Sequence, residues 1–136
     1  MKKILIQTLI ISLFFISFNA TAEIKHIKDG NVDAKVKLVV FESLTCSHCG
    51  DFHRDIYPKL KTDFIDKNLI SIEYRNFPLD IAAFNAAKIA HCRNDGKSEI
   101  LHHLYNNQSS WVRGSTIEDL NKNLKRVVQE SGFKLD

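Results

Sequence analysis

The stretch FESLTCSHCGDF, residues 41–52, decides the fold, because two cysteines stand where a strand pattern gives way to a helix pattern. The preceding segment, KVKLVVFE (35–42), is apolar and rich in β-branched residues, which predicts a buried strand. After Cys46, apolar side chains recur every four residues and predict the inward face of a helix: Phe52, Ile56, Leu60 and Phe64. Cys46 is therefore expected at the turn between the strand and the helix.

A cysteine at the start of a helix has an altered thiol. The first backbone N–H groups of a helix lack partners within it, and with the helix dipole they favour the thiolate of Cys46. Cys49, one turn later, can reach the same sulfur. Each pKa unit removed from Cys46 stabilises the dithiol by about 1.4 kcal/mol, or about 30 mV for a two-electron couple. His48 can donate a hydrogen bond or carry charge beside this thiolate, which favours a pair that donates disulfides.

The N-terminus has the composition of a secretory signal peptide. Residues 1–22 begin with two lysines after the first methionine, continue with an apolar run and end in Ala20-Thr21-Ala22. Cleavage after Ala22 would leave one domain, 23–136, in an oxidising compartment, which we expect to be the periplasm. An uncleaved membrane anchor is the alternative. The formal net charge is +3 and no basic run is present, which argues against nucleic-acid binding.

The rest of the chain is mostly helical in pattern. LISIEYRNF (69–77) predicts a second strand. A helix should begin after Asp80 and run to about Cys92, nearly all apolar and so buried on most sides. A short helix is expected around 100–105. Another should follow the capping sequence 115–118 and end at Gly132. Pro58 should kink the helix that follows Cys46. The expected order is strand, helix, strand and then three helices.

Three stretches resemble the DsbA-type thiol–disulfide oxidoreductases of the thioredoxin superfamily: VKLVVFESLTCSHCGDFH, FPLDIAAFNAAKIAHC and DGKSEILHHLYNNQSSW. The resemblance implies an α/β, thioredoxin-like fold in which 79–131 form a helical insertion. It implies that Cys46 is the nucleophile, Cys49 the resolving cysteine and His48 the residue that tunes them, without a cofactor. The implied function is an exported protein that donates disulfides to unfolded or partly folded secreted proteins. A quinone-linked membrane oxidase would reoxidise it.

Several positions depart from the pattern of that family. Ser47 stands where proline is usual, which should shift the redox potential without removing the chemistry. Val40 stands where many members carry a buried acid. Glu42, on the same face of the strand, is a candidate proton acceptor for Cys49. Neither proline of the sequence fits the family's cis-proline, so we expect a fold incomplete at the C-terminus, lacking the cis-proline loop and the last strands and helix.

Other interpretations stay open on the sequence alone. A reductase or isomerase would use the same cysteine pair, and a truncated chain could be a weakly active fragment or a binding remnant. A structural disulfide or a zinc site would also use the pair, with these candidate zinc ligands: Cys46, Cys49 and His53, with His91 and Cys92 in reserve. Cys92 is otherwise expected to be a small buried hydrophobe, or to pair with a cysteine beyond Asp136. The remaining histidines are expected at the surface or rim: His26, His91, His102 and His103.

Overall fold

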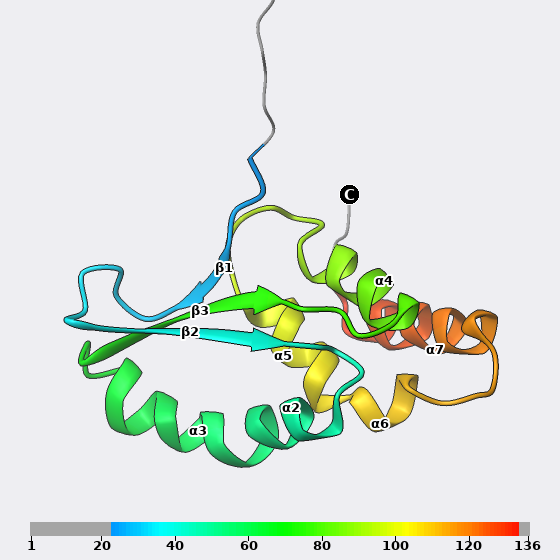
Figure 1. Cartoon of the computed structure of the whole chain (residues 1–136), viewed down its shortest axis with the longest axis horizontal. Coiled ribbons are helices and arrows are strands. Elements are labelled where there is room, and N and C mark those ends of the chain that lie inside the picture. Colours follow the sequence, from blue (N-terminus) through cyan, green and yellow to red (C-terminus); the bar gives the residue numbers. More distant parts are fainter. Residues whose placement is uncertain (1–22, 134–136) are drawn as a thin grey trace, which may run out of the picture.

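A computed structural model describes residues 23–133, which form a three-stranded sheet with helices packed against it (Figure 1). The strands are β1 (Ile27–Asp29), β2 (Val36–Glu42) and β3 (Ile70–Asn76), in the spatial order β1-β3-β2. β2 runs parallel to β3, and β1 runs antiparallel to it. The predicted signal peptide, 1–22, lies outside the described residues.

The strand β1 is missing from the sequence-based prediction, which expected two strands. Its three residues are too few to show an alternating pattern. It is fixed by its partner instead, because Ile27 lies opposite Tyr74 of β3 and both side chains are buried. The strand β1 matters for the candidate site, because its last residue, Asp29, bonds His102 there.

The prediction of a buried first strand is wrong for most of β2. Val36, Val39 and Phe41 are 50, 51 and 69% exposed, whereas Ile72 and Tyr74 of the central strand β3 are almost completely buried. β2 lies at an edge of this sheet. An apolar run shows that a strand is suited to burial, but it does not show which place in the sheet the strand takes.

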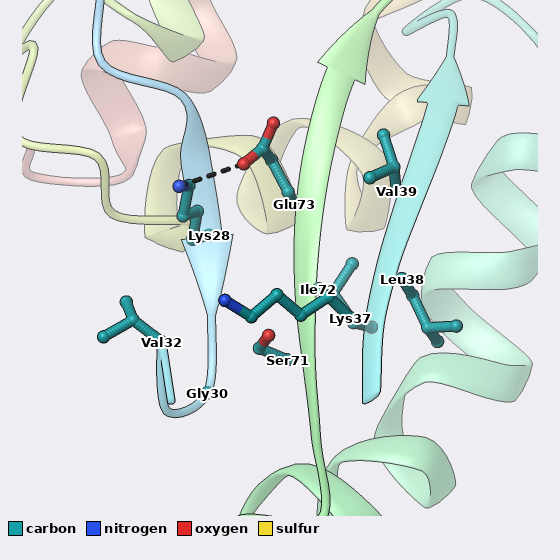
Figure 2. A pocket seen from close by; sticks show the side chains of 9 residues that line it. All are labelled: Lys28, Gly30, Val32, Lys37, Leu38, Val39, Ser71, Ile72 and Glu73. Atoms are coloured by element: carbon teal, nitrogen blue, oxygen red, sulfur yellow. Dashed lines mark ion pairs between the residues drawn. The ribbon is translucent and has the colours of Figure 1, made fainter. Parts of the chain in front are cut away.

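The outward face of the sheet carries a recess lined by residues of all three strands and the turn after β1 (Figure 2). Lys28 and Glu73 form an ion pair across it, with 2.9 Å between Nζ and Oε2. Lys37 and Val39 of β2 line the same recess. No cysteine lines it, so the outward face is separate from the predicted redox site.

The first long helix runs from 47 to 65 and contains two wider π-helical segments. Its parts are α2 (Ser47–Asp51), η1 (Phe52–Ile56), α3 (Tyr57–Leu60) and η2 (Lys61–Ile65). Pro58 lies in the first turn of α3, directly after η1. The missing N–H of Pro58 is accommodated there by the wider turn, in which the Tyr57 N–H bonds the Phe52 carbonyl.

The inward face of this helix matches the predicted one only in part, since Phe52 and Leu60 pack against the core as expected. Ile56 and Phe64 are 56 and 44% exposed, while His53, Tyr57 and Ile65 are buried. The prediction failed because it assigned polar side chains to the solvent. His53 and Tyr57 are buried because their polar atoms have partners inside the fold, as described below.

Four helices follow β3: α4 (Ile81–Ala90), α5 (Glu99–Asn106), α6 (Gln108–Trp111) and α7 (Ile117–Glu130). Two of the predicted helix ends are confirmed: the Asp80 carboxylate accepts a bond from the Ala83 N–H, and Gly132 has a positive φ just past α7. The capping sequence 115–118 is displaced by one residue, because Thr116 is the N-cap of α7 and accepts from the Asp119 N–H. α4 is buried on its alanine side alone, since Ile81 and Phe84 are 65 and 50% exposed, which corrects the expected burial on most sides.

The arrangement of these helices brings α5 to the redox site. α5 contacts both α2 and η1, and α4 packs between α5 and α7 (Figure 1). Among residues 23–133, every peptide bond is trans. In the same part of the chain, no helix combines the length and the apolar character that crossing a membrane requires.

Candidate active site

The two cysteines lie at the beginning of α2 as free thiols. Cys46 is the N-cap residue with extended backbone angles, and Cys49 follows in the first turn. The backbone and thiol of Cys49 hydrogen-bond the Cys46 sulfur, as does the backbone of His48, and these bonds lower the pKa of Cys46 below that of an ordinary thiol. Burial and the negative charge of Asp51 act in the opposite direction and are outweighed. Cys46 therefore has the character of a nucleophile and a leaving group.

Cys49 has the opposite character. Its pKa is raised to about 11, mainly by burial and also by the neighbouring Cys46 and Glu42, although a hydrogen bond with the backbone of Ser43 opposes them. Cys49 is therefore a thiol at neutral pH and must lose its proton before it can attack another sulfur. The two members of one short motif thus differ in the direction of their pKa shifts.

The His48 side chain, which was predicted to tune Cys46, is exposed to solvent. The imidazole is 94% exposed, and its Nδ1 lies 3.7 Å from Asp51 Oδ2. The contact that His48 makes with Cys46 comes from its backbone. The role of the imidazole itself stays a prediction.

A glutamine that the sequence analysis missed holds the loop before the cysteines in place. The buried Gln108 donates from Nε2 to the carbonyl oxygens of Leu44 and Cys46, at 2.8 and 2.9 Å. A Cβ on Gly50 would overlap with its Oε1, so any larger residue at that position would force Gln108 to shift. No local pattern marks Gln108, because its partners lie more than sixty positions earlier in the chain.

A second tie joins the loop to the start of α4. Thr45 donates from Oγ1 to Asp80 Oδ2 at 2.7 Å, and Asp80 also caps α4 through its other oxygen. The Leu79 N–H bonds the Ser43 hydroxyl at 3.3 Å. The cysteine loop is thus fixed from two sides by helices that follow β3 in the sequence.

Beneath the cysteines, a row of titratable side chains runs through the interior. Glu42 Oε2 lies 2.8 Å from His53 Nε2, and His53 Nδ1 lies 2.9 Å from His102 Nδ1. His102 Nε2 in turn lies 2.8 Å from Asp29 Oδ2. The expectation that His102 lies at the surface or rim is wrong, because its side chain is 16% exposed and bonded at both ring nitrogens.

The zinc interpretation finds no support in the geometry. Within residues 23–133, no group of three or more His, Cys, Asp or Glu side chains is arranged to hold a metal ion. His53 is directed to Glu42 and His102, and His91 bonds Asn76 at 2.7 Å. Cys92 is exposed, which corrects the expectation of a small buried hydrophobe.

The fold and the site together define a class of protein. A strand, a helix that begins with C-x-x-C, and a second strand parallel to the first are the active-site half of a thioredoxin-like protein. The sequence model of the Thioredoxin family matches residues 22–135, and the chain belongs to this family.

Comparisons with individual proteins place it among DsbA-type members. The crystal structure of Wolbachia pipientis alpha-DsbA1 superposes with a TM-score of 0.70 at 31% identity, over 80% of this chain and 55% of that one. A Rickettsia bellii protein named "Putative protein-disulfide oxidoreductase" is 36% identical over 93 residues, which are 67% of this chain and 36% of that protein. Disulfide bond formation protein D of Bacillus subtilis is 27% identical over 75% of this chain and 50% of its own length. The chain thus spans about half or less of the length of these three proteins.

Proposed function

We propose that the chain is an exported protein-disulfide oxidoreductase that donates disulfides to secreted proteins through the Cys46–Cys49 pair. The observation that carries the proposal is the opposite shift of the two thiols, with the pKa of Cys46 lowered and that of Cys49 raised. A lowered pKa stabilises the reduced pair and makes its disulfide a better oxidant. The names of the Rickettsia and Bacillus relatives support the same activity.

In the proposed reaction, a thiolate of the substrate protein attacks the Cys46 sulfur of the oxidised pair. A bond forms between the substrate sulfur and Cys46, the Cys46–Cys49 bond breaks, and Cys49 leaves and takes up a proton. A second thiolate of the substrate then attacks the substrate sulfur that is bonded to Cys46, and Cys46 leaves as a thiolate. The substrate gains one disulfide and the protein becomes the dithiol.

The partners follow from this reaction and from family resemblance. The substrates are unfolded or partly folded secreted proteins with free cysteines, and a quinone-linked membrane oxidase takes the electrons from the dithiol. The proposed location of the protein is the periplasm, with 1–22 acting as a signal peptide that is cleaved after Ala22. The mature domain is 23–136, in which 79–131 form the helical insertion.

A reductase is the second candidate, and Asp51 is the observation that favours it. Its carboxylate opposes the lowering of the Cys46 pKa and lies beside His48. A smaller net shift would leave the disulfide a weaker oxidant, and the pair would then run in the reducing direction. Only the direction of electron flow separates the two candidates.

Disulfide transfer to a peptide tests the proposal. The oxidised protein, in a Cys92→Ser background, is mixed with an unstructured peptide that carries two cysteines, and both products are followed by mass. We expect about one peptide disulfide for each oxidised protein, and none with the Cys46→Ser control. If the peptide stays reduced while the protein keeps its disulfide, donation is refuted and the reductase is favoured.

A further inference from the structure

Four titratable side chains from four separate elements form one continuous hydrogen-bonded row. Glu42 ends β2, His53 lies in η1, His102 in α5 and Asp29 at the end of β1. The three contacts measure 2.8, 2.9 and 2.8 Å in that order. Exposure changes along the row: the Glu42 and His53 side chains are 1 and 0% exposed, whereas those of His102 and Asp29 are 16% exposed. The row therefore runs from the interior to the surface.

Counting protons shows what this row can do. Each of the three contacts needs one shared proton, and a neutral imidazole supplies only one. The row therefore holds three protons, one more than its two neutral histidines carry. With both carboxylates ionised, the extra proton is on one imidazole, which then donates from both ring nitrogens. It can also be on Glu42, with each imidazole donating outward, or on Asp29, with each imidazole donating inward. Moving protons across the contacts converts these arrangements into one another.

The inner end of the row lies beside Cys49. The Cys49 sulfur bonds the backbone of Ser43, the residue after Glu42, and the Glu42 charge raises the pKa of Cys49. Tyr105 is stacked on His53 with 3.9 Å between ring centres. Burial is the largest cause of the raised pKa of the Tyr105 hydroxyl, and Glu42 and both cysteines also raise it. Among the described residues, Glu42 Oε1 is buried without a hydrogen-bond partner. One carboxylate oxygen is thus bonded to His53, and the other lies near the Tyr105 hydroxyl, which is likewise buried without a hydrogen-bond partner.

The outer end of the row opens to solvent. Asp29 lines a polar surface recess together with Tyr57, Lys61 and Asp66. Burial opposes the ionisation of Asp29, but bonds from His102, Ser98 and Tyr57 outweigh it and lower the Asp29 pKa to about 2. Asp29 thus passes a proton to water more readily than it keeps one.

We propose that Glu42, His53, His102 and Asp29 form a proton path that connects Cys49 with solvent during thiol–disulfide exchange. The proposal rests on the proposed function. When the dithiol is reoxidised, a disulfide oxidant first forms a mixed disulfide with Cys46. Starting with the extra proton on His53, the proton of the Cys49 thiol moves to Glu42 Oε1, the His53 Nδ1 proton moves to His102, and the His102 Nε2 proton moves to Asp29, which releases it to water, so that the row again holds three protons. The Cys49 thiolate then attacks Cys46, the Cys46–Cys49 bond forms, and the oxidant's sulfur leaves.

The same path serves disulfide donation in reverse, because the departing Cys49 thiolate needs a proton. Apart from the members of the row, these titratable groups face it: Cys46, Cys49 and Tyr105 at the inner end, and Tyr57, Tyr74, Lys61 and Asp66 at the outer end. Burial and nearby acids raise the pKa of each of the three tyrosines. The tyrosines therefore stay protonated at neutral pH and leave the carboxylates and imidazoles as the groups that exchange protons.

A chromogenic aromatic disulfide separates the two chemical steps. With the reduced protein in a Cys92→Ser background, attack by Cys46 releases one coloured nitrothiobenzoate, and closure by Cys49 releases a second. The second release is unimolecular and requires the Cys49 proton to leave. We measure both releases by stopped flow at neutral pH, in water and in mixtures with heavy water.

For the parent protein, we expect the rate of the second release to vary nonlinearly with the deuterium fraction of the solvent, because several protons move together. In His102→Gln and in Asp29→Asn, the second release should slow by at least about tenfold, the scale of lost general acid–base assistance. The first release should stay unchanged. His103→Gln is the matched control, because the next residue of α5 bonds the Val127 carbonyl and not the row, and both releases should stay at the parent rate.

Each outcome decides between the alternatives. A straight-line dependence on deuterium fraction in the parent protein overturns the path, whatever the variants do. Equal second-release rates in the parent, His102→Gln and Asp29→Asn overturn it too, as does an equal slowing of both releases, which would indicate a disturbed fold. If the parent never makes the second release, the cysteine pair does not close, and the proposed function fails together with the path. If the parent closes normally and the variants match it, only the path fails.

Discussion

The two cysteines stand three residues apart, yet their surroundings are opposite. Cys46 faces an open side formed by the exposed His48 and Asp51, where backbone N–H groups set its pKa. Cys49 faces a closed side made of Glu42, the row of histidines behind it and Tyr105. The C-x-x-C motif supplies the two sulfur atoms, and the surroundings of each sulfur set its pKa and therefore its role. Changes on the closed side should therefore have larger effects than changes on the open side.

Replacing the buried histidine should have the largest effect. His53→Leu leaves the Glu42 carboxylate buried without its partner, and breaking such a pair costs about 3–5 kcal/mol. We expect this loss in the free energy of unfolding, measured by urea denaturation. His48→Leu, on the open side, is the control and should change it by less than about 0.5 kcal/mol. Equal costs for the two histidines would contradict the contrast between the sides.

Adding one methyl group at Gly50 should have the next largest effect. The new Cβ of Gly50→Ala would meet Gln108 Oε1, and overpacking of this kind costs about 1–3 kcal/mol. The loss should appear in urea unfolding. In a Gln108→Ala background the same substitution should cost much less, because the obstructing amide is gone. A cost that is the same in both backgrounds would show that Gln108 does not confine α2.

Acid should remove the stabilisation that Asp29 provides. The Asp29 pKa is about 2 in the folded chain against an ordinary value of 3.8, which corresponds to about 2 kcal/mol. Because the folded pKa is the lower one, this stability is present above about pH 4 and is lost as the pH falls toward 2. Urea unfolding across this range should show the advantage of the parent over Asp29→Asn shrinking with the pH. A constant difference would rule out a depressed Asp29 pKa.

The smallest effect is expected on the open side. Asp51→Asn removes the charge that raises the Cys46 pKa, so the midpoint of Cys46 alkylation against pH should move lower by less than about one unit. Asp55→Asn, four residues further along the same helix, is the control and should leave the midpoint unchanged. An upward movement in Asp51→Asn would mean that Asp51 helps the thiolate through His48.

The features that could be predicted from the sequence are local. The strand, the cysteine turn and the following helix are adjacent in the chain, and caps such as Asp80 and Gly132 act within a few residues. Glu42 was singled out from its position on the strand, but the rest of the closed side could not be predicted, because His53 and His102 meet across 49 positions and the partners of Gln108 are more distant still. A polar residue is expected to face solvent unless a buried partner is known. For this reason the buried His53 and Tyr57 were not included in the predicted inward face of helix 47–65.

The central claim is that Cys46 is a stabilised thiolate beside a protonated Cys49. The most direct test is the rate of Cys46 alkylation against pH in the reduced protein, in a Cys92→Ser background and with Cys46→Ser as the blank. We expect one alkylated site with a midpoint below the ordinary thiol pKa of about 8.5, and no reaction of Cys49 until far more alkaline pH. A Cys46 midpoint near that of a free thiol, or equal reactivity of the two cysteines, would contradict it.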